Sequence, residues 1–378
     1  MSDFGLLSDP ANPFPEYARM RERGHVHRPR VGGSWVVCGH AEVEAVLRDP
    51  KTFSSELGGG VMSGVGNSMI MKDPPEHTRL RNIVSKAFTP RSIAELEPRI
   101  REITVGLLDA IDLDEPFDIV ERLAIPLPIT VIAEMLGVDP ADRVDFKRWS
   151  NAIIGTVPMH PMKLRDEFGG YFGRVLDDRR TYPRNDLITR LVSLDDRDAL
   201  TMDELLSFVM LLLVAGNETT TNLIALATLY LSRHPEQRDA IAAEPRKIPN
   251  AVEEILRFDG PVHMVPPRIV RRTVTVGDVE LRAGNWVTVV LGAANRDPLR
   301  FDDPDTFDIE RPDANAHVGF GAGIHFCLGA PLARLEGRIA LEEMLARMPS
   351  FRLARADDPV PFSGSSFIRT IQTLPVVA

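Results

Sequence analysis

One cysteine, Cys327, is the side chain of this sequence best placed to do chemistry, because a glycine-rich loop precedes it and a helix signal follows it. It stands in the stretch Phe320–Arg334. Pro331 suits the first turn of a helix, where its missing N–H costs nothing. Cys327 is therefore expected at a helix N-terminus, beside free amide donors and the positive end of the helix dipole, which favour its thiolate. Such a thiolate is a nucleophile or a metal ligand, whereas most isolated cysteines are buried and inert.

A cysteine protease would need a His/Asn arrangement that the sequence does not present, and a zinc site needs more ligands than this chain offers. The stretch Phe320–Arg334 instead resembles the haem-binding loop of the cytochrome P450 family, in which Phe, two Gly, His, Cys, Gly and a Leu-Ala-Arg run recur at these spacings. The resemblance implies that Cys327 is the axial ligand of haem iron, where a thiolate favours O–O cleavage. It further implies haem contacts for Phe320, Gly321, Gly329 and His325, the last at a propionate.

A second polar pair stands in the segment Asp73–Arg81. Asp73 can cap a helix that Pro74 begins, and His77 and Arg81, four residues apart, share one face of it. Taken alone, such a pair is more often an exposed polar face. The segment resembles the family's helix whose His and Arg bind the haem propionates, and Arg268 matches the family's propionate-binding Arg at the head of a strand. The resemblance therefore assigns all three side chains to the cofactor.

The longest periodic stretch, Thr201–Arg233, predicts a buried helix of about 45 Å that Thr201 and Glu204 cap and His234-Pro235 end. Its middle contains Gly216, which weakens a helix, and the acid Glu218, which is costly to bury. The Thr219 hydroxyl can bond the carbonyl of Ala215 and bend the helix. This run resembles the family's oxygen-activating segment, with Glu in place of the commoner Asp. The resemblance assigns Thr219 and Glu218 to proton delivery and places Ala215 and Gly216 at the haem.

A fourth motif is structural rather than catalytic. Glu254 and Arg257 lie three residues apart on a predicted helix, Pro249–Phe258, and match the family's Glu-x-x-Arg pair. The resemblance makes Arg311 the third member of the network. We expect these three side chains to support the cysteine loop.

The elements that position these motifs are mostly helices, with one small β region. Apolar periodicity predicts helices around Glu16–Arg23, Ala41–Arg48, 141–192 and Arg91–Leu136, the last interrupted at Pro116, Pro126 and Pro128. Two-residue alternation predicts strands at Ser34–Cys38, Arg268–Val276, Val279–Leu281 and Trp286–Leu291, and a last hairpin in 351–378. The resemblance implies the mainly α, α+β cytochrome P450 fold. It places the glycine-rich loop Phe53–Lys72 over the haem and a lid within 141–192.

Composition narrows the class of protein. The 378 residues carry 44 basic and 54 acidic side chains, a net charge of −10, which argues against nucleic acid as a partner. With only two cysteines, Cys38 and Cys327, a secreted disulfide scaffold is excluded. We read Cys38 as a buried thiol in a strand. No linker or repeat divides residues 1–378, so we expect a single domain. The first residues do not show a basic segment followed by an apolar one, as a signal peptide would, so we expect a cytoplasmic protein that is not bound to a membrane. We also expect a monomer.

The family resemblance implies a monooxygenase with haem b and O2, which consumes two electrons and two protons and puts one oxygen atom into the substrate. Electrons would come from NAD(P)H through a reductase and an iron–sulfur ferredoxin, since no dinucleotide-binding glycine motif appears here. An apolar pocket implies a largely hydrophobic small molecule; its expected lining is Leu211, Val214, Ala215, Val265, Ile368 and part of 57–71.

Two other classes remain open. A haem-based sensor or electron carrier would not need the Glu218–Thr219 pair, and peroxide-driven relatives usually carry Arg-Pro in its place. For the redox partner we expect a basic patch on the cysteine side of the haem, formed by Arg79, Arg334 and Arg338.

Overall fold

The computed structural model describes residues 9, 11–28, 33–57, 68–86, 88–153, 158–193, 200–364 and 367–378. Two expectations therefore lie partly outside the described residues: most of the glycine-rich loop (58–67) and the segment 154–157 of the expected lid.

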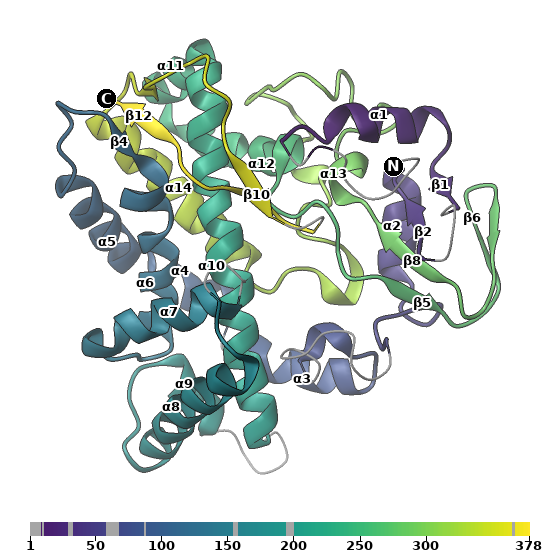
Figure 1. The fold of residues 1–378 in the computed structure, drawn as a ribbon, viewed down its shortest axis with the longest axis horizontal. Helices are drawn as coiled ribbons and strands as arrows, with labels where there is room; N and C mark the ends of the chain where they lie inside the picture. Colours follow the sequence, from purple (N-terminus) through teal and green to yellow (C-terminus); the bar gives the residue numbers. More distant parts are fainter. Residues whose placement is uncertain are drawn as a thin grey trace.

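Helix α10 (Met202–Arg233) runs through the middle of the molecule (Figure 1). Thr201 caps it in the predicted box with Glu204, and His234 ends it, so the predicted boundaries are confirmed. By length and hydropathy alone α10 could cross a membrane, but 65% of its most apolar window is buried inside the protein. We interpret it as the core helix.

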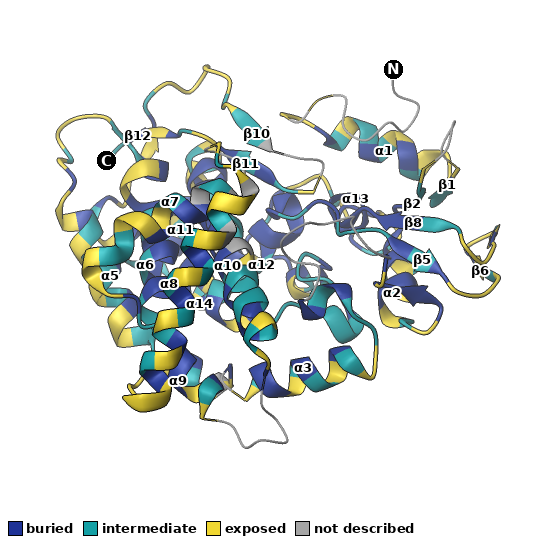
Figure 2. Ribbon diagram, turned by 60° about the horizontal axis from the view of Figure 1, so that its bottom comes forward, coloured by how far each residue is buried: buried dark blue, intermediate teal, exposed yellow. Residues whose placement is uncertain are grey.

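Helices surround α10. It packs on α6 (Pro126–Met135), α12 (Ile248–Asp259) and α14 (Ala330–Arg347), and α14 also packs on α5 (Glu97–Asp109). The other helices on this side are α4 (Pro90–Ala94), α7 (Arg143–Ile153), α8 (Pro161–Thr181), α9 (Leu187–Val192) and α11 (Pro235–Ala243). A π-helix (Val120–Ala124) and short 3-10 turns at Pro140–Asp142 and Pro245–Lys247 join them. Exposed residues lie on the outer turns of α5, while α12 is almost wholly buried (Figure 2).

A small sheet packs beside this bundle. Its strands, in the order β1-β2-β8-β5-β3, are Val26–His27, Trp35–Val37, Trp286–Val289, Arg268–Val270 and Phe53–Ser54, and only β2 and β8 run parallel. A hairpin of β6 (Val274–Val276) and β7 (Val279–Leu281) extends from it, turning at Gly277, whose φ is +56°. Helices α1 (Phe14–Glu22), α2 (His40–Arg48) and α13 (Leu291–Ala294) pack around the sheet (Figure 1). The predicted mainly helical fold with a small β region is confirmed.

The structure differs from the sequence-based expectations at the start of one helix and in the tail. Helix α3 begins at Glu76, not at Pro74, and spans Glu76–Ser85; the Asp73 carboxylate accepts the Ser55 N–H instead of capping. The predicted interruption at Pro126 falls between the π-helix Val120–Ala124 and α6, and Pro126 and Pro128 lie in the first turn of α6, where N–H groups need no helical acceptor. The tail forms the predicted hairpin, in which β10 (Phe362–Gly364) pairs with β11 (Arg369–Ile371), and also a three-stranded sheet, in which β12 (Pro375–Val377) pairs with β4 (Phe117–Asp118) and β9 (Arg352–Leu353).

Candidate functional site

A mostly apolar cavity of about 270 Å³ lies between α10, α3, the strand-leading segment 261–268 and the loop before α14. Residues that are hundreds of positions apart in the sequence share its wall. The predicted site residues that line it are His77, Arg81, Leu211, Ala215, Gly216, Thr219, Val265, Arg268, Phe320, Gly321, His325, Cys327 and Gly329. The cavity therefore joins three of the motifs that the sequence presented separately, namely the cysteine loop, the His77–Arg81 segment and the middle of α10, together with Arg268.

The cysteine loop is held by its own backbone and by α2. The Cys327 N–H donates to the Phe320 carbonyl at 2.9 Å, and Gly329 precedes the first turn of α14, as predicted. Gly323, with φ +68°, passes so close to α2 that a Cβ there would lie 2.3 Å from the Leu47 carbonyl oxygen. The loop can therefore approach α2 only with glycine at this position.

Opposing influences act on the Cys327 thiol. Burial raises its pKa above the ordinary value, while backbone N–H groups of Gly329 and Ala330 and the Arg81 guanidinium act in the other direction. The predicted helix-terminus donors are thus present, but burial outweighs them. The thiolate form would therefore need a further positive charge next to the sulfur to stabilise it.

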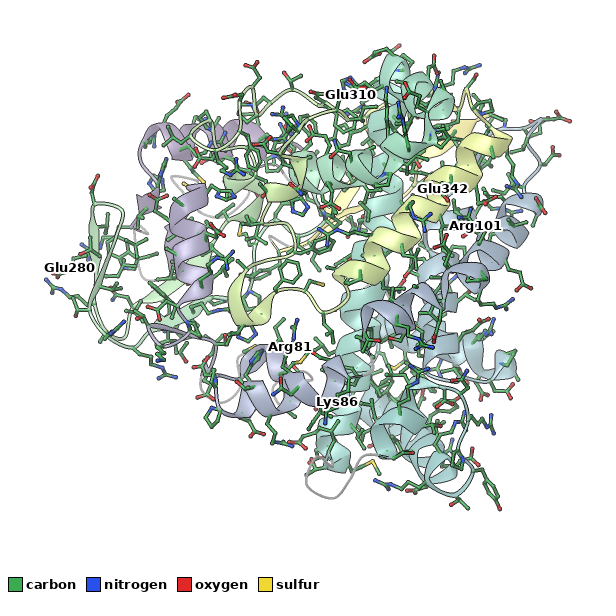
Figure 3. The ribbon with its side chains drawn as sticks, turned by 180° about the vertical axis from the view of Figure 1, so that it is seen from behind. Arg81, Lys86, Arg101, Glu280, Glu310 and Glu342 are labelled. Atoms are coloured by element: carbon green, nitrogen blue, oxygen red, sulfur yellow. The ribbon has the colours of Figure 1, made fainter. Side chains whose placement is uncertain are left out.

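One end of the cavity gathers four basic side chains. His77 is 2% exposed, both of its ring nitrogens are buried without a hydrogen-bond partner, and its ring centroid is 4.5 Å from that of His325. Arg268 is 5% exposed and donates to the Pro266 carbonyl at 2.8 Å. Figure 3 shows Arg81 on α3, facing the cysteine loop. These side chains form an anion-binding corner.

The charge in this corner is poorly compensated. Among the described residues, neither Arg81 nor Arg268 forms an ion pair with a carboxylate. Burial lowers the pKa of Arg268 to about 10, against the attraction of Asp73. Burial, followed by the positive charges of Arg268, His77 and Arg81, lowers the pKa of His325 to about 3. The corner favours a ligand that carries negative charge.

The middle of α10 has the local geometry that the sequence predicted. The Thr219 hydroxyl donates to the Ala215 carbonyl at 2.6 Å. Gly216 lines the cavity, and a Cβ there would lie 2.4 Å from Ile132 Cδ1, so it also permits close packing of α6. The Glu218 carboxylate does not belong to the cavity lining; it accepts the Thr370 hydroxyl of β11 at 2.8 Å. Burial raises the pKa of Glu218, and the bond from Thr370 opposes this.

A second acid, Glu336 on α14, lines the cavity and was missed by the sequence analysis. It is completely buried, its Oε2 has no hydrogen-bond partner, and burial raises its pKa to about 8. It follows an arginine and a leucine in a helical run, where glutamate is ordinary. Only its contact with the cavity distinguishes it.

The predicted supporting network is assembled below the cysteine loop. Glu254 pairs with Arg257 at 2.6 and 2.7 Å and with Arg311 at 3.4 Å. Arg257 also donates to the carbonyl of Asn295, whose side chain accepts the Val318 N–H just before the loop. The three residues thus lie where they can hold the loop.

The remaining predicted residues lie around the site. The structure does not describe the Val214 side chain or residues 58–67. Ile368 is not among the described residues that line the cavity, but it bridges to the lining residue Val262. The three arginines expected to form a basic patch all carry ion pairs: Arg334 with Glu253 at 2.6 Å, Arg338 with Glu97 at 2.7 Å, and Arg79 with Glu76 and Glu204. Their positive charge is therefore largely compensated.

Known proteins resemble this chain over nearly its whole length. The family model "Cytochrome P450" matches residues 165–374. The chain is 41% identical to the cytochrome P450 monooxygenase PikC of Streptomyces venezuelae, over 99% of this chain and 93% of the relative, and 40% identical to the vitamin D(3) 25-hydroxylase of Pseudonocardia autotrophica, over 97% and 93%. The crystal structure of CYP109E1 from Bacillus megaterium in complex with testosterone superposes with a TM-score of 0.89 at 37% identity, covering 97% of this chain and 98% of that one.

Proposed function

This chain belongs to the cytochrome P450 family and is a monooxygenase of that family, and from this premise we propose how its own residues hold the cofactor and the substrate. The family implies a haem-thiolate cofactor. The observation that carries our proposal is that Cys327, the basic corner and the Thr219 segment of α10 share one apolar cavity.

We propose that the cavity holds haem b with Cys327 as the iron ligand. When bound, haem would supply the activation of O2, in which two electrons from an external donor and two protons are consumed, one oxygen atom enters the substrate and the other leaves as water. The iron cation would supply the further positive charge that stabilises the Cys327 thiolate, and the N–H groups of Gly329 and Ala330 would donate hydrogen bonds to the sulfur. Phe320, Gly321, Ala215 and Gly216 line the rest of the cofactor space.

The basic corner fits the two carboxylates of such a cofactor. His77, Arg81, Arg268 and His325 offer N–H donors, and the His77 nitrogens are buried without partners, which is costly unless a ligand satisfies them. Propionates would provide acceptors at this end of the cavity. We assign these four side chains to them.

For proton delivery we propose the pair Thr219 and Glu218. Thr219 holds a hydroxyl proton at the cavity wall and donates it to the Ala215 carbonyl until a better acceptor is present. Glu218 is the adjacent acid, and burial favours its protonated form. Its bond to Thr370 means that the carboxyl must rotate before it can reach the cavity.

The substrate we propose is a largely apolar small molecule. Leu211, Val265 and their apolar neighbours form most of the wall, with few polar groups to fix a hydrophilic ligand. The relatives named for vitamin D(3) hydroxylation and solved with testosterone are consistent with this class. Electron supply from NAD(P)H through a ferredoxin and its reductase, a monomeric state and a cytoplasmic location stay predictions.

The test of the cofactor assignment compares the chain's two cysteines. The reduced, CO-bound wild type should show the red-shifted Soret band of thiolate-ligated haem. Cys327→Ala should lose this band, whereas the matched variant Cys38→Ala, at a fully buried thiol that donates to backbone carbonyls, should keep it. A Cys327→Ala protein that retains the band would contradict the assignment.

A further inference from the structure

A fully buried charged cluster lies behind one wall of the cavity and serves none of the roles described above. At its centre, Asp259 ends α12 and has no exposed side-chain surface. Arg369 of β11 donates to both oxygens of Asp259 at 2.5 Å, and the Tyr230 hydroxyl of α10 donates to one of them at 2.6 Å. His263 bonds Asp259 at 3.1 Å and is itself bonded to the Tyr17 hydroxyl at 3.0 Å. We call these five side chains the Asp259 cluster.

The cluster brackets two paired segments, the first of which lines the cavity. Pro261, Val262 and Val265, just after Asp259, line it, and Val262 forms a bridge with Ile368, just before Arg369. The Arg369 N–H donates to the Pro261 carbonyl at 3.1 Å, and the His263 N–H donates to the Phe367 carbonyl at 2.9 Å. We call residues 261–266, together with the residues 367–369 that pair with them, the pocket wall. The ion pair between Asp259 and Arg369 lies at one end of this pairing.

The charge is fully satisfied and firmly ionised. Although burial alone would raise it, the pKa of Asp259 is held far below its ordinary value by the charge of Arg369 and the bond and charge of His263. A second guanidinium, that of Arg296, lies close enough to attract Asp259 and stacks on the rings of Phe14 and Phe258 at 3.5 and 3.7 Å. The cluster therefore joins α1, α10, α12 and β11 around one carboxylate.

Net stability does not explain such a cluster. Replacing a buried ion pair by apolar side chains of similar volume is often neutral or stabilising, because desolvating two charges costs about as much as their attraction returns. A buried ion pair instead fixes the relative orientation of the segments that carry it, because hydrogen bonds from Arg369, Tyr230 and His263 to Asp259 depend on geometry. A one-residue slip between the two segments would turn the Val262 and Ile368 side chains to opposite faces.

We propose that Asp259 and Arg369 are positioning residues for substrate specificity: the pair fixes the register of the pocket wall and so determines how an apolar substrate is oriented. The inference rests on the proposed use of this cavity for substrate. It adds a determinant of specificity that touches no substrate itself.

The test compares the haem-loaded wild type with Asp259→Asn, which keeps the shape and removes the charge, and Arg369→Lys, which keeps the charge and removes the planar guanidinium that also donates to the Ala11 carbonyl. A matched control is Arg238→Met, since Arg238 is another buried arginine, which donates to the Phe351 carbonyl at 2.6 Å and does not line the cavity. The rate of amide hydrogen exchange in residues 261–266 and 367–371 reports the stability of the pocket wall directly, without a substrate. Testosterone, as a probe, reads orientation through its affinity and the distribution of its oxygenated products.

We expect amide exchange in the wall to accelerate at least tenfold in Asp259→Asn and several-fold in Arg369→Lys, with products spread over more positions. Arg238→Met should lower the melting temperature while leaving wall exchange and product positions as in the wild type. A folded Asp259→Asn or, if that variant does not fold, a folded Arg369→Lys with wild-type wall exchange and products would overturn the proposal. Loss of the thiolate Soret band in the wild type would instead refute the proposed function, so the two failures are distinguishable.

Discussion

Glu336 provides a quantitative prediction, because the cavity places a carboxyl group where water and partners cannot reach it. Burial raises its pKa from 4.5 to about 8 in the folded protein. Between these values the native state keeps a proton that the unfolded chain releases. The free energy of unfolding must therefore fall as the pH rises through this window.

The perturbation is Glu336→Gln, which preserves the shape of the side chain and cannot ionise. One pKa unit corresponds to about 1.4 kcal/mol, so ionisation on unfolding destabilises the wild type by about 2 kcal/mol at pH 6 and about 4 kcal/mol at pH 8. The variant avoids this cost. Its stability relative to the wild type should therefore increase by about 3 kcal/mol from pH 5 to pH 8.

Two assays measure this effect on the haem-loaded protein. Urea unfolding at a series of pH values gives the difference between variant and wild type, with Glu342→Gln, an ion-paired glutamate on the same helix, as the control. The infrared difference between wild type and Glu336→Gln should show the C=O stretch of a protonated acid that disappears with a midpoint near the pKa of about 8. A stability difference that is constant with pH, together with loss of that stretch below pH 6, would refute the reasoning.

Three further predictions follow from the site. Thr219→Ala should still bind haem and substrate but release peroxide in place of oxygenated product, because the cavity loses its hydroxyl donor, whereas Glu218→Gln should slow turnover more than it diverts it; tight coupling of NAD(P)H consumption to product in Thr219→Ala would contradict the assignment. Arg334→Glu should slow reduction by an acidic ferredoxin, more at low salt, and Glu253→Gln, which removes the partner of Arg334, should accelerate it; stopped-flow rates that ignore both changes across a salt series would exclude this docking face. Gly323→Ala should destabilise the protein by about 1–3 kcal/mol more than Gly321→Ala, since both glycines have positive φ but only Gly323 has a backbone oxygen in the path of a Cβ, and equal melting temperatures would refute the close contact with α2.

The comparison of sequence and structure separates two kinds of information. Patterns confined to one stretch were read correctly: the capping box of α10, the Thr219–Ala215 hydrogen bond and the spacing of Glu254 and Arg257 depend on neighbours three or four residues apart. The start of α3 was predicted two residues too early, because a proline is compatible with the first turn of a helix but does not by itself show which residue begins it.

Charge pairing across the fold was beyond the sequence. Arg334 looked like a free cation until Glu253, 81 positions earlier, proved to neutralise it, and the bond between Glu218 and Thr370 could not be foreseen. Which side chains pair in this way depends on which helices cross. From the sequence alone, several glutamates were equally plausible partners for Arg334.

By itself the sequence determined the local features: a cysteine between glycines and a helix start, an acid next to an alcohol in the middle of a long helix, and basic residues at fixed spacings. The chemistry assigned to these features came from their resemblance to the family. Only the tertiary structure decided which buried acids face the cavity, which arginines keep their charge, and that Asp259 meets Arg369 across 110 positions behind the pocket wall. The physical reason is that burial and long-range contact set the energy of a charge. Both are properties of the packed chain, whereas periodicity and capping are properties of its neighbours in sequence.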